Sequence, residues 1–156
     1  MTAKILSGRE IAESIKEEVR NEVARLFEEQ GFRPGLTVVR VGEDPASAVY
    51  VGNKVKTSHE LGIVSEHIHL EADTTHDEVL STVKRLNRRD DIDGILVQLP
   101  LPDHIDENAI LEAIDPQKDV DGFHPMNVGR LNQGQRSLVP CTPAGVIEIL
   151  KRSGIG

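Results

Sequence analysis

The chain is predicted to fold as a three-layer α/β domain, with a mainly parallel sheet flanked by helices. Segments with helical and with strand periodicity alternate along its 156 residues, and 38% of these residues are hydrophobic, enough for a core. Residues 95–97 form a continuous apolar run, which is typical of a central strand covered on both faces. Alternating elements of this kind form right-handed crossovers between parallel strands.

The first half of the chain alternates two helices with two strands. Apolar residues recur every three or four positions over 7–30, which predicts an amphipathic helix that ends at Gly31. The β-branched run 36–41 predicts a buried strand. A second helix is predicted over 45–61, and the alternating segment 63–70 is predicted to be a strand.

The second half continues this alternation. A capping-box pattern that starts at Thr75 predicts a third helix, and 92–99 is predicted to be the third strand. A helix is expected around 106–114, followed by a long polar connection. Thr142 as N-cap, with Pro143 at the first helical position, predicts where the final helix begins.

Composition excludes several classes of protein. Lys+Arg 18 against Asp+Glu 26 gives a net charge of −8, and there are only three Phe, one Tyr and no Trp. A chain so acidic and so poor in aromatic residues is not expected to bind nucleic acid. No apolar run approaches the ~20 residues that cross a bilayer, and the first ten residues resemble no signal peptide, so we expect no membrane association. The single Cys141 agrees with a cytoplasmic location.

Ser47, Tyr50 and Lys54 lie on one face at the start of the second predicted helix, just after a strand. Val51 and Val55 are beside this face, which places Lys54 at the border of the buried stripe. Partial loss of hydration there can lower the pKa of a lysine toward neutrality, as general-base chemistry requires. Alternatively, Lys54 only extends its amine into solvent and Tyr50 only packs.

Gln98 ends the third predicted strand, immediately before a proline-rich exit. An amide at the carboxyl end of a parallel strand can face a ligand or Lys54, because ligands bind at this edge of open sheets. It can equally fasten the neighbouring loop. One of the bonds before Pro100 and Pro102 can be cis, and the sequence leaves both isomers open.

Asp119 and Asp121 precede Gly122 in an Asp-x-Asp-Gly pattern. A turn is one interpretation. A calcium loop would need further oxygen ligands at fixed spacing, which are missing. The functional alternative is a carboxylate that recognises a ring with adjacent N–H donors.

Histidines and glycines add no further site to this prediction. His67 and His69 share a strand face and His124 follows the aspartate loop, but nothing indicates that the three converge, so no metal site is predicted. The chain has neither G-x-G-x-x-G after a strand nor G-x-x-x-x-G-K-[ST], and therefore no recognisable nucleotide-binding loop.

Taken together, these segments resemble the bifunctional methylenetetrahydrofolate dehydrogenase/methenyltetrahydrofolate cyclohydrolase family, in order and in spacing, over essentially the whole chain. Gly52 departs from the larger residue that is common in the family. The matching segments are 47–54 with 60–63, 93–102, 116–123 with 127–131, and 140–143.

The resemblance implies oxidation of 5,10-methylenetetrahydrofolate with NADP, followed by hydrolysis of the methenyl product to 10-formyltetrahydrofolate. It implies that Lys54 assists the attack of water and moves a proton, and that Tyr50 stacks on the folate. Gln98 would bond to Lys54 and tune it, and Asp121 would bind the amino-pyrimidine end of the pterin. These four are the expected catalytic residues.

By the same resemblance, further residues are expected at the cleft. Ser47, Leu99, Pro100 and Gly122 would complete the folate site. Cys141 and Thr142 would lie at its edge, toward NADP. In the family a Rossmann domain binds this cofactor and commonly forms the contact of a homodimer.

The resemblance also implies a division of the chain. Residues 1–143 are expected to be the folate-binding catalytic domain, and 144–156 the start of a helix that leads to an NADP-binding domain absent from this sequence. Two alternatives remain: a stand-alone folate-binding or interaction module without turnover, and the substrate domain of another dehydrogenase, such as shikimate dehydrogenase. Tyr50 with Lys54, and Asp119 with Asp121, argue against the second.

Overall fold

Three parallel strands form the sheet of this computed structural model, which describes residues 5–155. Their order is β2-β1-β3, with β1 at Gly35–Val41, β2 at Val64–Leu70 and β3 at Gly94–Val97. Leu36 of β1 is paired with Ser65 on one side and with Gly94 on the other. The predicted α/β class and parallel sheet are therefore confirmed.

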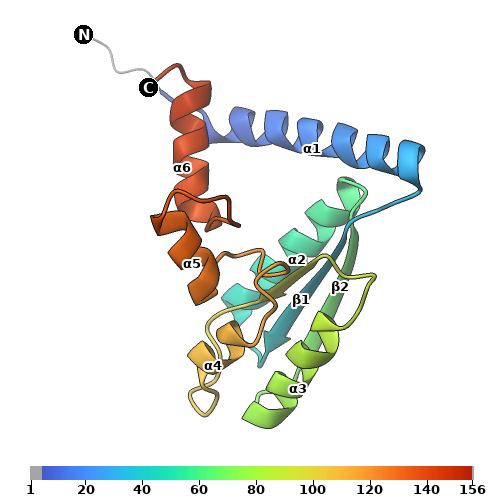
Figure 1. Cartoon of the computed structure of the whole chain (residues 1–156), viewed down its shortest axis with the longest axis vertical. Helices are drawn as coiled ribbons and strands as arrows, with labels where there is room; N and C mark the ends of the chain where they lie inside the picture. The colour runs from blue at the N-terminus through green and yellow to red at the C-terminus, as the bar shows by residue number, and fades with distance from the viewer. Residues whose placement is uncertain (1–4, 156) are drawn as a thin grey trace.

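Helices cover both faces of this sheet (Figure 1). Helix α2 (Pro45–Glu60) packs on one face through Val51, and α3 (His76–Asn87) packs on the other. The larger core cluster lies on the α3 side and also includes Ile110 of α4 (Glu107–Glu112). The capping box predicted at Thr75 is present, since its side chain accepts from the backbone N–H of Glu78.

Helices α1 (Gly8–Gln30) and α6 (Cys141–Arg152) meet away from the sheet (Figure 1). Ser7 caps α1 at its start, and Gly31, with φ 68°, ends it as predicted. Arg152 bonds to Glu18 with both terminal nitrogens, and Nη2 lies 2.8 Å from Oε2. None of the helices within residues 5–155 is long and apolar enough to cross a membrane.

The structure differs from the predicted elements at three places. Strand β3 covers Gly94–Val97 and is shorter than the predicted 92–99; the Leu99–Pro100 bond that follows is cis, and Pro100 has no N–H to donate to a ladder. The predicted polar connection contains a helix, α5 (Pro125–Asn132), with Pro125 in its first turn. The prediction that Thr142 caps the last helix is wrong: Pro140 holds that position, and Pro143 is tolerated because first-turn N–H groups lack helical acceptors.

Candidate functional site

A pocket of about 460 Å³ lies between α2 and the strands β1 and β3. Its volume is within the range of roughly 300–1,000 Å³ that is usual for small-molecule sites. One wall is the polar face of α2, and the opposite side is apolar. The lining residues are Leu36, Tyr50, Asn53, Lys54, Thr57, Ser58, Leu96, Val120, Asp121 and Cys141.

Gln98 holds the side chain of Lys54 in place. Its Nζ donates a hydrogen bond of 2.9 Å to Oε1 of Gln98, which directly follows β3. The Nε2 of Gln98 in turn donates to the carbonyl of Leu99 at 2.7 Å, so the amide oxygen is directed to the lysine. Gln98 therefore contacts Lys54, and its amide also fastens the exit loop: both interpretations left open by the sequence apply.

The two aspartates of the Asp-x-Asp-Gly segment have different roles: Asp119 bonds to the surrounding chain, whereas Asp121 faces the pocket. Asp119 is buried, and its Oδ2 accepts from the Asn127 amide at 2.9 Å and from the backbone N–H of His124 at 2.8 Å. Asp121 lines the pocket and has no hydrogen-bond partner among residues 5–155. Burial raises the pKa of Asp121, nearby Lys54 lowers it, and Asp119 raises it further.

Backbone contacts bring this loop to the pocket. Ile95 donates to the carbonyl of Lys118 at 2.7 Å and forms a parallel bridge with Asp119, so residues 118–121 run beside β3. Gly122 is buried with φ 67°, and an added Cβ would lie 2.8 Å from the carbonyl oxygen of Leu138. This close approach places the segment that precedes Cys141 against the aspartate loop.

The predicted site residues do not all reach the pocket. Tyr50, Lys54, Asp121 and Cys141 line it, and Gln98 contacts it through Lys54. Ser47 is buried at the start of α2, beside Asp44. The predicted residues outside the lining are Ser47, Gln98, Leu99, Pro100, Gly122 and Thr142.

Sequence analysis missed three polar lining residues, Asn53, Thr57 and Ser58. A signal was present, because each is three or four residues after a predicted site residue, Tyr50 or Lys54, and so shares the helix face. Tyr50 is 62% exposed, so its ring is available to a ligand.

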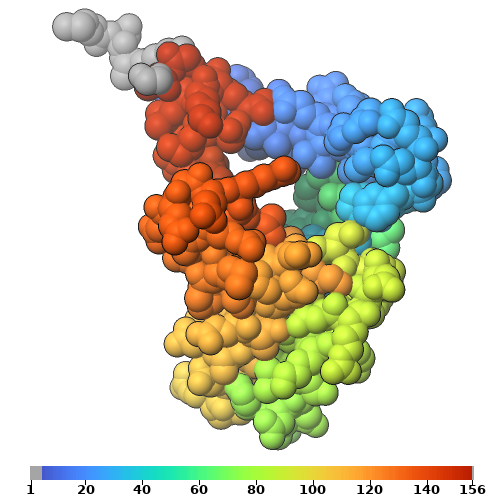
Figure 2. All heavy atoms as spheres, viewed as in Figure 1, coloured from blue at the N-terminus to red at the C-terminus, as the bar shows by residue number. Residues whose placement is uncertain are grey.

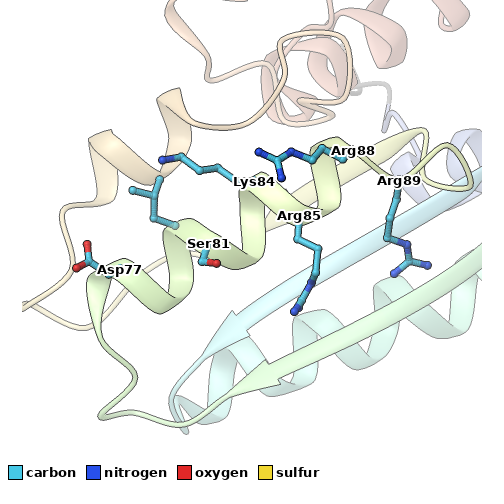
Figure 3. A pocket seen from close by; sticks show the side chains of 7 residues that line it. Asp77, Ser81, Lys84, Arg85, Arg88 and Arg89 are labelled. Carbon is cyan, nitrogen blue, oxygen red and sulfur yellow. The ribbon is translucent and has the colours of Figure 1, made fainter.

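A larger hollow, of about 720 Å³, follows the outer surface of α3 (Figure 3). Lys84 and Arg88 lie along one side of the helix, and Arg85 and Arg89 along the other. The last-turn cations complement the negative end of the helix dipole, and Arg89 is already paired with Glu66 and Asp91. This surface therefore has an ordinary structural explanation, and the α2 pocket remains the candidate site.

The histidines do not converge. His67 and His69 stack on β2 with ring centroids 6.2 Å apart, whereas His124 caps α5 by accepting from Met126 N–H. Residues 5–155 contain no group of three or more His, Cys, Asp or Glu side chains that could hold a metal ion.

Comparisons with known proteins agree with this geometry. Residues 6–121 match the family model described as tetrahydrofolate dehydrogenase/cyclohydrolase, catalytic domain. The chain is 53% identical over 154 residues to the bifunctional protein FolD of Brevibacillus brevis, covering 99% of this chain and 54% of that protein. For FolD of Acetivibrio thermocellus the identity is 52% over 155 residues, with coverage of 99% and 54%. The chain thus spans about half the length of these curated relatives.

Solved structures give the same result. The bifunctional methylenetetrahydrofolate dehydrogenase/cyclohydrolase FolD of Campylobacter jejuni matches with a TM-score of 0.94 and 46% identity, over 97% of this chain and 54% of that chain. The Trypanosoma brucei enzyme, solved with NADP cofactor and inhibitor, matches with a TM-score of 0.94 and 38% identity, over 99% and 54%.

Proposed function

Since the chain belongs to the tetrahydrofolate dehydrogenase/cyclohydrolase family, we propose that its α2 pocket binds folate and takes part in two reactions. The first oxidises 5,10-methylenetetrahydrofolate to 5,10-methenyltetrahydrofolate, with NADP as hydride acceptor. The second hydrolyses the methenyl product to 10-formyltetrahydrofolate. The chain supplies the folate side of both reactions.

The observation that carries this proposal is the hydrogen bond of 2.9 Å from Lys54 to Gln98 at the pocket. Hydrolysis adds water to the methenyl carbon, breaks its bond to N5 and leaves the formyl group on N10. Water must lose both of its protons as its oxygen becomes the formyl oxygen: N5 gains one of them and the other is released. A lysine held in place by Gln98 can accept the first proton and return a proton to N5.

Tyr50 and Asp121 supply the binding contacts in this proposal. The exposed ring of Tyr50 offers a stacking surface one turn before Lys54. Asp121 is partly buried without a hydrogen-bond partner in the described chain, so adjacent N–H donors of an amino-pyrimidine would supply what its carboxylate lacks. Ser47, Leu99, Pro100 and Gly122 remain proposed contributors to the folate site.

Within residues 5–155, no glycine-rich loop leads from a strand into a helix N-terminus, where a pyrophosphate is commonly bound, and β1 leads into α2 through the acidic residues Glu43 and Asp44. NADP, which supplies hydride acceptance when bound, is therefore proposed to be held mainly by a part of the parent protein outside this chain. Cys141 and Thr142, exposed at the start of α6, are the proposed points of contact with it.

The family resemblance supports further proposals about the parent protein. We expect a cytoplasmic homodimer that serves one-carbon metabolism, including purine biosynthesis. A stand-alone folate-binding module without turnover is the alternative, since the pocket has the folate side but no nucleotide loop.

Replacement of Lys54 by methionine tests the catalytic proposal. In the full-length gene product, Lys54→Met should reduce methenyltetrahydrofolate hydrolysis by about 100-fold or more, the contribution usual for acid–base groups. The reaction is followed by absorbance. Folate affinity is measured by calorimetry, and this affinity should change little.

The matched control is Lys56→Met. Lys56 is on the same helix, but its side chain is 76% exposed and lies 3.9 Å from Glu60. Its replacement should leave hydrolysis unchanged. A normal rate in Lys54→Met would overturn the assignment, and folate binding without any hydrolysis by the unmodified protein would favour the binding module.

A further inference from the structure

Arg40 of β1 is a buried guanidinium with too few hydrogen-bond acceptors. It is 7% exposed, and within residues 5–155 its Nε and Nη1 have no partner. Its Nη2 lies 3.1 Å from Nε2 of His69 and 3.8 Å from Oε2 of Glu43. Buried polar groups without partners are rare in folded proteins, so this one requires an explanation.

The sheet itself does not require a charge at this position. The neighbouring β1 residues Val38, Val39 and Val41 are buried and apolar. A buried charge that lacks acceptors costs stability, and apolar replacements of such groups are often neutral or stabilising. The few hydrogen bonds of Arg40 therefore do not compensate for the burial of its charge.

The histidines beside Arg40 do not neutralise it. Nε2 of His69 also lies 3.1 Å from the carbonyl of Gly42 and 3.1 Å from Oε1 of Glu43. One ring nitrogen cannot accept from Arg40 and also donate to these oxygens. Burial lowers the pKa of His67, and the charge of Arg40 lowers it further, which favours the neutral form of this ring.

The negative charges next to Arg40 belong to the loop that leads into α2. Glu43 is within ion-pair distance of Arg40. The pKa of Asp44 is lowered mainly by the hydrogen bonds of Asp44 to Ser47, and the nearby charge of Arg40 lowers it further. Asp44 caps α2, with its Oδ2 2.6 Å from the backbone N–H of Ser47. The charge of Arg40 thus acts on the residue that fixes the first turn of the helix.

We propose that Arg40 is a positioning residue for the folate site. Its buried charge holds the loop of Glu43 and Asp44, and through the cap it fixes the start of α2. Tyr50 is one turn closer to this cap than Lys54, so the effect falls on folate binding more than on hydrolysis. This inference rests on the proposed function of the pocket.

Kinetics of Arg40→Met in the full-length gene product test the proposal. KM for methenyltetrahydrofolate should rise about five-fold, as expected from loss of part of an N-cap. The kcat should stay within about two-fold of the unmodified protein, because Lys54 and Gln98 are untouched. The thermal midpoint should change little, because the loss of part of the cap and the removal of a buried charge act in opposite directions. Arg40→Lys keeps the charge and should restore KM.

Two further variants isolate the loop contact. Arg20 donates to the carbonyl of Glu60 at the opposite end of α2, so Arg20→Met is the matched control and should leave KM unchanged. Glu43→Gln should raise KM by itself but add little to Arg40→Met, since both act through one contact. Full additivity, an unchanged KM in Arg40→Met, or a joint fall of kcat and midpoint would overturn the proposal.

Hydrogen exchange separates this proposal from the function on which it rests. In the 156-residue chain, backbone amides of the first two turns of α2 should exchange faster in Arg40→Met and not in Arg20→Met. This readout needs no folate. If the protein turns over no folate but the exchange differs as expected, the proposed function fails and the positioning of α2 stands. Equal exchange in the two variants would overturn the positioning.

Discussion

Asp121 shows how one side chain of the pocket costs stability. Burial raises its pKa above the ordinary value of 3.8, and only part of this effect is offset by Lys54. Between 3.8 and the raised pKa the folded state therefore binds more protons than the unfolded state. The free energy of unfolding consequently falls as pH rises through this window, and the cost is complete above it.

Asp121→Asn is expected to raise the thermal midpoint at pH 7 and to abolish tight folate binding. Near pH 3 the difference in midpoint should disappear, because the native carboxyl is then neutral. Thermal unfolding across this pH range measures the effect. Asp73→Asn, at an exposed carboxylate after β2, is the control and should show no such dependence. A lower midpoint of Asp121→Asn at pH 7 would contradict the cause given for its raised pKa.

Residue patterns in the sequence singled out Lys54 and Gln98, each with a structural alternative, but did not separate Asp119 from Asp121. The first pair was predictable because adjacent parallel strands end at the same edge of a sheet, and helical spacing places Lys54 there. Asp119 and Asp121 differ in their hydrogen bonds: only Asp119 accepts from Asn127 of α5 and from His124, the N-cap of that helix. The sequence pattern of this polar segment predicted a connection, so helix α5 was not foreseen.

At the scale of elements, alternating periodicity was sufficient for the sheet and for most helices, since each has a clear apolar face or cap. It was insufficient for α5, where the exposed Met126, Val128 and Leu131 form no buried stripe. The start of α6 was also missed, because Pro140 ends the preceding segment without a side-chain cap. Helix α5 is held instead by the hydrogen bond from Asn127 to Asp119, and Pro140, just before α6, lies beside Gly122 of the aspartate loop.

Gly122→Ala tests this contact between elements. The left-handed conformation alone should cost about 1 kcal/mol for a residue other than glycine. The added Cβ must also displace the carbonyl of Leu138, which lies 2.8 Å from its position. We expect a total loss of roughly 2–3 kcal/mol in the free energy of unfolding. Folate affinity should fall and Cys141 should react faster with a thiol reagent.

Gly134→Ala is the matched control for this substitution. Gly134 has φ 69°, nearly the value at Gly122, but an added Cβ meets no heavy atom within 4 Å. The control should show only the conformational cost and an unchanged reactivity of Cys141. Equal losses in the two variants, measured by denaturant unfolding, would show that the contact with Leu138 does not hold the loop.

At the scale of the whole molecule, the pocket belongs to the sheet and its nearest layers. Its lining comes from β1, α2, β3, the aspartate loop and the first residue of α6. Helix α1 contributes none of it. Figure 2 shows an opening between α1 and the α5–α6 segment, above the sheet.

Helix α1 is expected to open at a lower free energy than the rest of the fold. Val23 is its one buried residue within the described chain, whereas α3 buries Val79, Thr82, Val83 and Leu86. The pair of Arg152 and Glu18 joins α1 to α6, but exposed ion pairs contribute little to stability. Amides of α1 should therefore exchange at least about tenfold faster than those of α3, a difference of ~1.4 kcal/mol.

Hydrogen exchange of the 156-residue chain, followed by mass spectrometry, measures this difference. Salt provides the internal control, because roughly 1 M salt shortens the screening length to about 3 Å and weakens exposed ion pairs. Exchange in α1 should then accelerate, while α3, docked through apolar contacts, should not change. Equal protection of α1 and α3 would mean that the helix folds with the sheet as one cooperative unit. The faster exchange expected here would mean that the sheet and α3 keep their structure while α1 is open.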